Sequence, residues 1–366
     1  LVKLDHEVVL INNGDGFKNY PADYSNRAFW CESKIGNIPR QIIYRITKFD
    51  ISKIERGIRF YFHLNKLKNF DVVQLINEKP IQTTSKFEFF LLKKIFQQNK
   101  NVFLLCSGID FSVTKHLLAK KERYSILNPY FENIAGAKNE NNFILSYTTK
   151  TSLKIHEFIL KNCKGIIASD IDYINPNREY SKFLGLIPNP INIEKNQYIE
   201  LKISDKIILF LGINPSTYYT KGISFFEKAL EIIKEKYKSK IEIVIAKNMP
   251  YNEYIKLYDE AHVLLDQVYG FDQGYNALEA MAKGKVVFTG AETEFLEYYN
   301  LKEDEVAINA LPEVDYLVKK ISFLIENPKE IIKISHNARD FIEKEHNFVK
   351  ISTEYIKKWN SKINPI

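Results

Sequence analysis

The sequence predicts an α/β protein with two doubly wound domains, each built on a parallel sheet. Short apolar runs alternate with amphipathic helical patterns along most of the chain, which is typical of parallel sheets covered by helices. The 366 residues are enough for two domains of ordinary size. Two prolines at residues 188–192 interrupt the pattern and begin a polar connection that reaches Asp205, so we place the domain boundary at 190/191.

Both halves contain predicted strands with helices between them. Strand-like runs lie at residues 7–11, 71–76, 101–107 and 165–169 in the first half, and at 207–211, 241–246, 262–266 and 286–289 in the second. Further helices are expected at residues 252–259, 312–326, 328–345 and 348–359. Apolar residues recur at helical spacing in two other segments: Ile51, Ile54, Ile58 and Phe62, and Ile223, Phe226, Leu230 and Ile233.

Composition indicates a globular protein of a reducing compartment. Hydrophobic residues make up 45% and charged residues 27% of the chain. The longest apolar runs fall far short of the ~20 residues that a membrane-spanning helix needs. Three widely spaced cysteines, Cys31, Cys106 and Cys163, argue against a disulfide scaffold or a zinc site, and the seven histidines lack metal spacing. We therefore expect a cytoplasmic protein without a metal or cofactor.

The formal charge of +7 has two interpretations. Lysine-rich runs such as residues 234–240 alternate with acids, as solvated helix faces do. The alternative is attraction to anionic lipid or to phosphate-bearing substrates. No dense arginine cluster suggests nucleic acid.

The most informative segment is residues 266–290, DQVYGFDQGYNALEAMAKGKVVFTG. It predicts a strand, a glycine-containing loop, a helix and a second strand. The loop allows close backbone approach, and the start of the helix offers unpaired N–H groups and a positive dipole end to a phosphate. Glu279 lies about one turn into the helix, near enough to bind a group beside that phosphate. The alternative is an ordinary amphipathic helix between buried strands, because Leu278 and Met281 are typical of a core.

Residues 277–287 resemble the donor-site signature of retaining, family 4-type glycosyltransferases with the GT-B fold. Residues 187–191 are similar to the interdomain segment of these enzymes, residues 105–110 to a strand-end loop facing the cleft, and residues 4–10 to the end of the first helix and the second strand. The last match implies that the family's first strand is absent, so we expect a truncated N-terminus.

The resemblance implies two Rossmann-like domains facing a central cleft. Residues 1–190 would form the acceptor-side domain and residues 191–345 the nucleotide-sugar-binding domain, with a C-terminal helix in 346–366 crossing back to the first domain. A nucleotide-sugar donor, a UDP- or GDP-sugar, would transfer its sugar to a saccharide or lipid-linked acceptor.

Glu279 and Lys221 are the first candidate catalytic residues. By resemblance, Glu279 accepts hydrogen bonds from the ribose hydroxyls, as an ionised carboxylate can, and Lys221 neutralises charge on the departing diphosphate. The alternatives are an acid that complements the helix dipole and a solvated lysine at a helix start.

Two departures from the family pattern concern the same site. The arginine expected after Gly212 is missing, since Ile213 and Asn214 follow. The family's first glutamate corresponds to Phe271, and its neighbour Asp272 either takes over that role or caps the turn.

The remaining candidates are donor-binding or acceptor-side residues. Backbone N–H groups are expected to reach the donor from Gly274, Tyr275, Asn276 and Ala277, with Gly212 and Asn214 nearby. Met249 and Tyr251 either pack on the nucleobase or belong to the core. Asp266 and Gln267 either contact the ligand or order the loop. Asp110 and Asp15 are the acceptor-side candidates, with ordinary loop or turn aspartates as the alternative. Asp170–Asp172 matches an Asp-x-Asp metal pattern, which we interpret as a strand-end loop.

The sequence thus predicts a retaining, metal-independent hexosyltransferase of surface polysaccharide synthesis, in the cytoplasm or peripheral at the inner face of the cell membrane. The alternatives are a GT-B sugar-nucleotide epimerase and a catalytically degenerate GT-B binding subunit.

Overall fold

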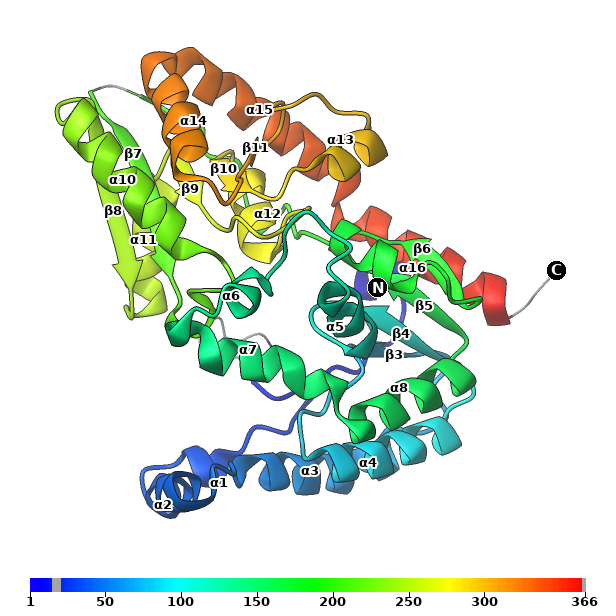
Figure 1. Cartoon of the computed structure of the whole chain (residues 1–366). Helices are drawn as coiled ribbons and strands as arrows, with labels where there is room; N and C mark the ends of the chain where they lie inside the picture. The colour runs from blue at the N-terminus through cyan, green and yellow to red at the C-terminus, as the bar shows by residue number, and fades with distance from the viewer. Residues whose placement is uncertain (15–20, 204, 364–366) are drawn as a thin grey trace.

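The chain folds around two main parallel sheets, one in each half of the molecule (Figure 1). The structure is a computed structural model and describes residues 1–14, 21–203 and 205–363. In both sheets every pairing is parallel, and helices cover the sheets, as the alternating pattern predicts.

The first sheet has four strands in the order β3-β4-β5-β6. They are β3 (Val73–Ile76), β4 (Val102–Cys106), β5 (Gly165–Ala168) and β6 (Phe183–Leu186). The predictions of β3, β4 and β5 are confirmed, whereas β6 was missed because a short, half-buried FLGL run carries no clear pattern. The helices of this half are α1 (Phe29–Glu32), α2 (Asn37–Thr47), α3 (Ser52–His63), α4 (Ser85–Gln98), α5 (Phe111–Leu118), α6 (Asn128–Phe131), α7 (Lys138–Leu145), α8 (Lys150–Asn162) and α9 (Ile174–Asn177).

The predicted strand at residues 7–11 is wrong. Only Ile11 is in a strand, the two-residue β1 (Ile11–Asn12), which pairs with β2 (Tyr24–Ser25). The side chains of Val9 and Ile11 pack against a cluster under α3 and α4. The apolar residues of this segment therefore contact helices and do not form a strand of the main sheet.

The second sheet has five strands in the order β11-β10-β9-β7-β8. They are β7 (Ile207–Ile213), β8 (Ile241–Lys247), β9 (Val263–Leu265), β10 (Val286–Thr289) and β11 (Ile308–Asn309), with helices α10 (Ile223–Tyr237), α11 (Tyr251–Glu260), α12 (Tyr275–Ala282), α13 (Thr293–Tyr299), α14 (Val314–Glu326) and α15 (Pro328–Glu345). The predicted strands and helices of this half are confirmed to within a few residues. The short α13 and β11 were missed.

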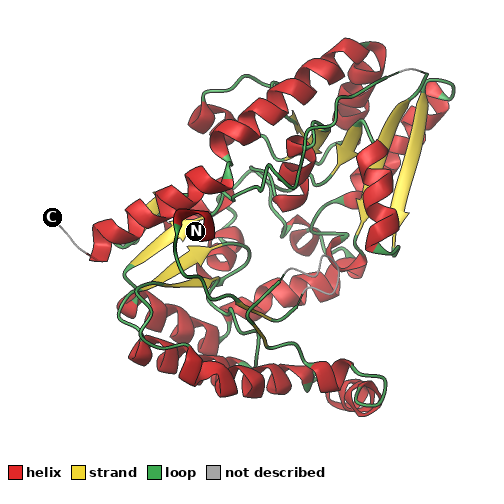
Figure 2. Cartoon of the chain, turned by 180° about the vertical axis from the view of Figure 1, so that it is seen from behind, coloured by secondary structure: helices red, strands yellow, loops and turns green. Residues whose placement is uncertain are grey.

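The last helix, α16 (Phe348–Ile363), packs on the first sheet although it follows the second in sequence (Figure 2). Its Ile351, Tyr355 and Trp359 share a core cluster with Phe103 of β4 and Ile167 of β5. The chain thus crosses between the two halves twice, and the first crossing leaves β6 at Leu186 and reaches β7 at Ile207.

Helices α1, α2 and α3 project along one edge of the first half (Figure 1). The helical spacing of Ile54, Ile58 and Phe62 correctly predicts α3, but this stripe faces outward. The buried residues of α3 are Ser52, Gly57 and Phe60. Within the described residues, no helix is long and apolar enough to cross a membrane.

Candidate active site

The strand order of the second sheet has one switch point, between β7 and β9. Across the sheet the strands follow one another as β8, β7, β9, β10 and β11. Numbered by their order along the chain, this is the arrangement 2-1-3-4-5. Ligands of such sheets bind beyond the carboxyl ends of the strands at this switch point. The residues that follow β7 and β9 therefore form the expected ligand-binding edge of this sheet.

Lys221, after β7, and Asp266, after β9, form an ion pair at this point. The distance from Lys221 Nζ to Asp266 Oδ1 is 2.8 Å, and the Asp266 side chain is only 2% exposed. Asn276 Nδ2 donates to the same oxygen at 3.0 Å, and Thr289 Oγ1 donates to the other at 3.4 Å. One buried carboxylate thus holds the side chains of two residues that the sequence predicts at the donor site, Lys221 and Asn276.

Gly222 supports this arrangement through its backbone. Its φ of +65° lies in the left-handed region, and a Cβ there would lie 2.3 Å from a Val268 methyl carbon. Glycine is therefore needed to turn the chain from Lys221 into α10.

Helix α12 begins beside the ion pair. Gly274 is its N-terminal flanking residue, and a Cβ at Gly274 would meet no atom within 4 Å, so its α-carbon faces open space. Tyr275 is 45% exposed, whereas Ala277 is completely buried and has only its N–H to offer a ligand. The first-turn N–H groups have no partner within the helix, which suits them to an anion.

Glu279 lies one turn further into α12 and is half-buried. Burial, together with the charges of Asp266 and Glu279, raises the pKa of the Tyr254 hydroxyl. Glu279, Asp266 and Tyr254 therefore lie close to one another at the strand ends.

The other donor-side candidates lie around this point in different surroundings. Asn214 Oδ1 accepts hydrogen bonds from the N–H and hydroxyl of Ser216, at 3.0 and 2.7 Å, and so caps the turn after β7. Met249 packs against the core of this half. Tyr251 is half-buried at the start of α11. A Cβ at Gly212 would lie 2.9 Å from the Tyr254 hydroxyl oxygen, so a side chain does not fit there.

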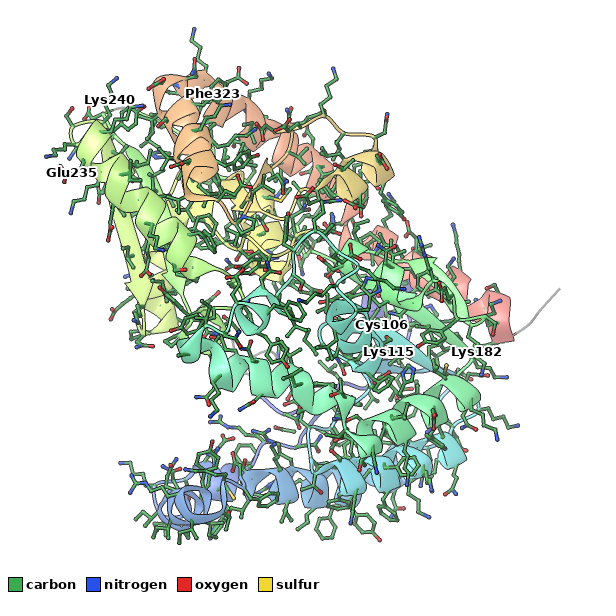
Figure 3. All side chains as sticks on the ribbon, in the orientation of Figure 1. Cys106, Lys115, Lys182, Glu235, Lys240 and Phe323 are labelled. Atoms are coloured by element: carbon green, nitrogen blue, oxygen red, sulfur yellow. The ribbon has the colours of Figure 1, made fainter. Side chains whose placement is uncertain are left out.

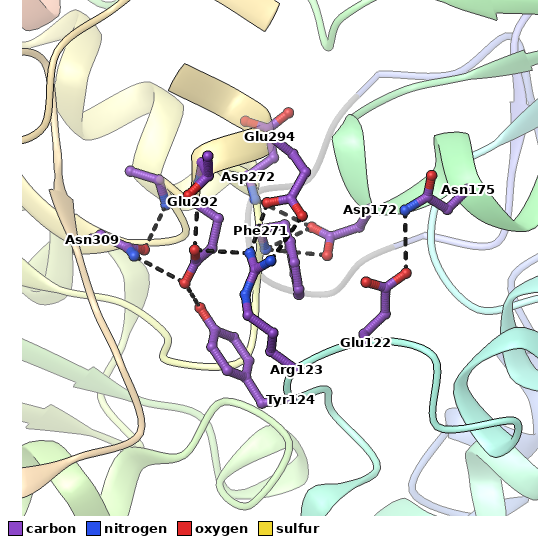
Figure 4. A network of polar contacts seen from close by, with 12 residues as sticks. Glu122, Arg123, Tyr124, Asp172, Asn175, Phe271, Asp272, Glu292, Glu294 and Asn309 are labelled. Carbon is purple, nitrogen blue, oxygen red and sulfur yellow. Dashed lines mark hydrogen bonds and ion pairs between the residues drawn. The ribbon is translucent and has the colours of Figure 1, made fainter. Parts of the chain in front are cut away.

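Two aspartates join the halves reciprocally across the cleft (Figure 4). Asp172, after β5, accepts the backbone N–H groups of Phe271 and Asp272 at 3.1 and 3.3 Å. Asp272 in turn accepts the N–H of Ile171 at 3.0 Å and that of Gln273 at 2.7 Å. Asp272 is 5% exposed. In this conformation its carboxylate holds the two halves together.

Burial raises the pKa values of these acids. It raises the pKa of Asp272 to about 6, and burial with the nearby Asp272 charge raises the pKa of Asp172 to about 7. Burial and the charges of Asp172 and Asp272 raise the pKa of Asp170 well above its usual range. The cluster therefore gains protons more readily than isolated aspartates do.

Arg123 and Tyr124, in the loop after α5, make a second joint. Arg123 donates to Glu294 at 2.7 and 3.0 Å and to Glu292 at 2.9 Å, and the Tyr124 hydroxyl also donates to Glu292 (Figure 4). The Arg123 guanidinium lies 4.8 Å from the centre of the Phe271 ring. Phe271, at the position where the resemblance predicts a glutamate, is thus a buried contact between the halves.

A cavity of about 170 Å³ lies between these joints. Its wall is formed by residues of α5 and the loop after it, of the loop after β5, of the loop before α12 and of α13. Five carboxylates line it, and no described lysine or arginine does: Glu122, Asp170, Asp172, Asp272 and Glu294. Asp170 Oδ1 is buried without a hydrogen-bond partner among the described residues.

Asp110 lies outside this cavity. It is fully buried, and its side chain caps α5 by accepting the Val113 N–H at 2.8 Å. Burial and the Glu78 charge raise the pKa of Asp110 to about 7. The structure thus gives Asp110 a capping role and no access to the cavity. Asp15 lies outside the described residues.

Glu140 of α7 makes a contact between the two halves that the sequence did not predict. Its carboxylate accepts the N–H of Thr220 at 2.8 Å, the Thr220 hydroxyl at 2.8 Å and the Tyr219 N–H at 3.2 Å. An acid of the first half therefore holds the loop that carries Lys221. No local pattern marks Glu140, Arg123 or Tyr124 as contact residues. Asp172 did carry a signal, because it follows a predicted strand.

No group of three His, Cys, Asp or Glu side chains within the described ranges is arranged to hold a metal. Asp170–Asp172 forms the predicted strand-end loop, and its second acid binds the backbone across the cleft.

Comparison with known proteins agrees with this architecture. Residues 224–357 match a protein family described as glycosyl transferase-like. No curated protein matches the chain in sequence. Sucrose-phosphate synthase from Thermosynechococcus elongatus has a similar structure, with a TM-score of 0.56 and 15% identity over 96% of this chain and 87% of that one.

Two further solved structures are similar at low identity. HepE from Anabaena, in complex with UDP-glucose, has a TM-score of 0.54 and 12% identity over 97% of this chain and all of its own. A variant of S. aureus TarM, in complex with UDP, has a TM-score of 0.53 and 14% identity over 86% of this chain and 60% of its own. The predicted fold is confirmed: this chain has the GT-B fold of two Rossmann-like domains, and its residues 224–357 are similar in sequence to a glycosyl transferase-like family.

Proposed function

We propose that this protein transfers a sugar from a nucleotide-sugar donor to a saccharide or lipid-linked acceptor, with retention of anomeric configuration. The observation that carries the proposal is the cluster at the switch point of the second sheet. There a cation, Lys221, and the start of α12 lie at the same edge, held by the buried Asp266. This combination suits a diphosphate flanked by hydroxyl-bearing groups.

Each part of the donor has a matching part of the site. Lys221 and the first N–H groups of α12 would hold the diphosphate and neutralise the charge that develops as it leaves. Glu279 would accept the ribose hydroxyls. The acidic cavity would take the transferred sugar, because carboxyl oxygens accept hydrogen bonds from hydroxyls and Asp170 Oδ1 lacks a partner among the described residues.

The size of the cavity supports movement of the domains. Its volume of about 170 Å³ is below the ~300–1,000 Å³ of typical ligand pockets. A whole nucleotide-sugar would therefore require the joints at Asp172, Arg123 and Glu140 to open and then close again around it, excluding water.

The chemistry we favour is departure and attack on the same face of the sugar. The engaged Asp272 is poorly placed as a nucleophile, since both its oxygens accept backbone N–H groups. Because Lys221 offers a fixed cation, we propose that transfer needs no metal. The UDP-glucose of HepE and the UDP of TarM support a UDP-sugar donor; a GDP-sugar is the other candidate. The pathway we propose is surface polysaccharide synthesis at the inner face of the cell membrane.

The test is a panel of UDP-, GDP- and dTDP-sugars, with binding followed by calorimetry and products by NMR. We expect one donor to bind, and Lys221→Ala to lose most of that binding and activity. The matched control is Lys228→Ala, an exposed lysine of α10. Retention predicts an axial or equatorial product linkage that matches the donor, and added EDTA should leave the rate unchanged. Failure of every donor to bind the wild type would refute the proposal.

A catalytically degenerate binding subunit is the second candidate. It is favoured by Phe271, which is buried where the family has a glutamate, and by the missing arginine after Gly212. Donor binding without turnover, with a range of acceptors, would support it. NMR of the donor incubated without acceptor would also detect an epimerase.

A further inference from the structure

Helices α1, α2 and α3 form a surface that we call the N-terminal apolar face, and its side chains point away from the protein. Helix α2 buries none of its residues. Six large apolar side chains of this face are more than half exposed: Trp30, Ile35, Ile38, Ile42, Ile46 and Phe62. On α2, Ile38, Ile42 and Ile46 recur at a spacing of four residues and so lie on one side of the helix.

The exposed stripe continues along α3. Ile54, Ile58 and Tyr61 are each more than 40% exposed. The Tyr61 ring stacks near that of Phe90 on α4, with ring centres 6.3 Å apart, and Phe90 is 42% exposed. Monomeric soluble proteins rarely expose a contiguous apolar surface of this kind.

The segment that builds this face also holds most of the excess positive charge of the protein. Residues 29–69 contain nine lysines and arginines and three acids, a balance of +6 out of a total of +7. The three acids are already engaged: Glu32 with Arg27 and Arg56, Asp50 with Arg40, and Glu55 with Arg59. Six cations make no salt bridge to a described residue: Lys34, Arg45, Lys48, Lys53, Lys66 and Lys68.

We infer that the N-terminal apolar face lies on a lipid bilayer with anionic head groups, its isoleucines and aromatic rings in the interface and its cations on the phosphates. Amphipathic helices with apolar and basic residues bind such surfaces by both forces together. A second copy of the chain would bring two segments of charge +6 close together. Nucleic acid would leave the aliphatic side chains exposed.

The position of the face leaves the rest of the protein free. In Figures 1 and 2, α1 to α3 lie along the lower edge, away from the second domain, and none of their residues lines the cavity. A bilayer against this edge would not cover the cleft, and would bring the first domain close to a lipid-linked acceptor. The inference extends the proposed membrane contact but does not require transferase activity.

The test is co-sedimentation of the full chain with vesicles of neutral phosphatidylcholine, or of the same lipid with 30% phosphatidylglycerol. We expect binding to the anionic vesicles, reduced by 0.5 M salt. Arg45→Gln with Lys48→Gln should weaken it about 20- to 30-fold, since each charge near an anionic surface is worth about fivefold. Ile46→Ser with Phe62→Ser should weaken it about tenfold or more.

The matched control is Phe323→Ser with Lys240→Glu. Both side chains are labelled in Figure 3 at the opposite end of the molecule, on and near α14 and α10, and Phe323 is 48% exposed. This control should bind vesicles like the wild type. Thermal midpoints and UDP binding of all variants report separately on folding and on the nucleotide site. Any of three results would overturn the inference. The wild type could fail to bind anionic vesicles, all variants could bind them equally, or the protein could dimerise through this face without lipid.

Discussion

Helices α10 and α3 have the same kind of apolar pattern but present it to opposite environments. In α10, Phe226 and Ile233 are completely buried and Leu230 is 3% exposed. In α3, Ile54, Ile58 and Phe62 stand at equivalent helical spacing and are 41%, 44% and 73% exposed. Spacing therefore identifies a helix but does not say what its apolar side touches.

The difference lies in what the opposite side of each helix offers. The other side of α10 is rich in lysine and glutamate, so only the apolar side can face the sheet. The inner side of α3 carries Ser52, Gly57 and Phe60, and Gly57 lets the Phe87 ring and the Thr83 hydroxyl approach closely. Small residues on its inner side let α3 pack closely against its neighbours, and its larger apolar residues lie on the outer, exposed side.

The largest expected effect is the difference between the two helices in how much a Phe→Ala substitution lowers the free energy of unfolding. Phe226→Ala should lower the free energy of unfolding by about 3–5 kcal/mol, because it leaves a cavity in a closed core. Phe62→Ala should change it by at most about 0.5 kcal/mol, because the ring is mostly exposed. Urea unfolding followed by circular dichroism measures both. A similar loss in the two variants would mean that α3 packs inward in solution.

The next effect concerns the site that the second domain builds. Lys221→Ala should lower kcat/KM for the donor by about 10²–10³-fold, as loss of a fixed charge at a leaving group does. Asp266→Asn should lower it less, since Lys221 would keep its charge and lose its partner. Steady-state rates with Lys228→Ala as control measure this. Unchanged kcat/KM in Lys221→Ala would remove the lysine from the mechanism.

The sequence was a better guide to the second domain than to the first. Residues 266–290 form the predicted strand, loop, helix and strand, because each boundary carries a local cause such as Gly274 or Gly284. Asp266, left open between a ligand and a loop role, proves to hold Lys221 and Asn276. A contact between residues 45 positions apart leaves no local pattern.

The cleft itself was the least predictable part. Asp110 lies in the loop after β4, as expected, yet its side chain caps α5. Asp172 and Glu140 find their partners about 100 and 80 residues away, in backbone N–H groups that any sequence provides. Such contacts depend on how the domains meet, which only the folded chain defines.

Replacing Glu140 tests the contact between the two domains, with a smaller expected effect. Glu140→Ala should lower the free energy of unfolding by about 1–3 kcal/mol, because two backbone N–H groups and a hydroxyl lose a charged acceptor. It should also loosen the loop that carries Lys221. Hydrogen exchange at residues 217–222 measures the loosening, with the exposed Glu157 of α8 replaced by Ala as control. Unchanged exchange would mean that this joint is open in solution.

The smallest effect is a pH dependence at the Asp172 joint. Asp172 has a pKa of about 7 in the folded protein and about 3.9 when unfolded, so the folded state binds more protons between these values. The contribution of this acid to stability is therefore greatest at low pH and is lost as the pH rises from about 4 to 7.

Asp172→Asn should remove this slope, because an amide oxygen still accepts the Phe271 N–H but carries no charge to oppose Asp170 and Asp272. The free energies of unfolding of wild type and variant, measured from pH 5 to 8, should diverge by on the order of 1 kcal/mol, with the variant gaining on the wild type at high pH. Asp315→Asn, an exposed acid of α14, should run parallel to the wild type. Parallel curves for Asp172→Asn as well would mean that the aspartates are separated and solvated in solution. The two domains would then meet less tightly than α10 meets its own sheet.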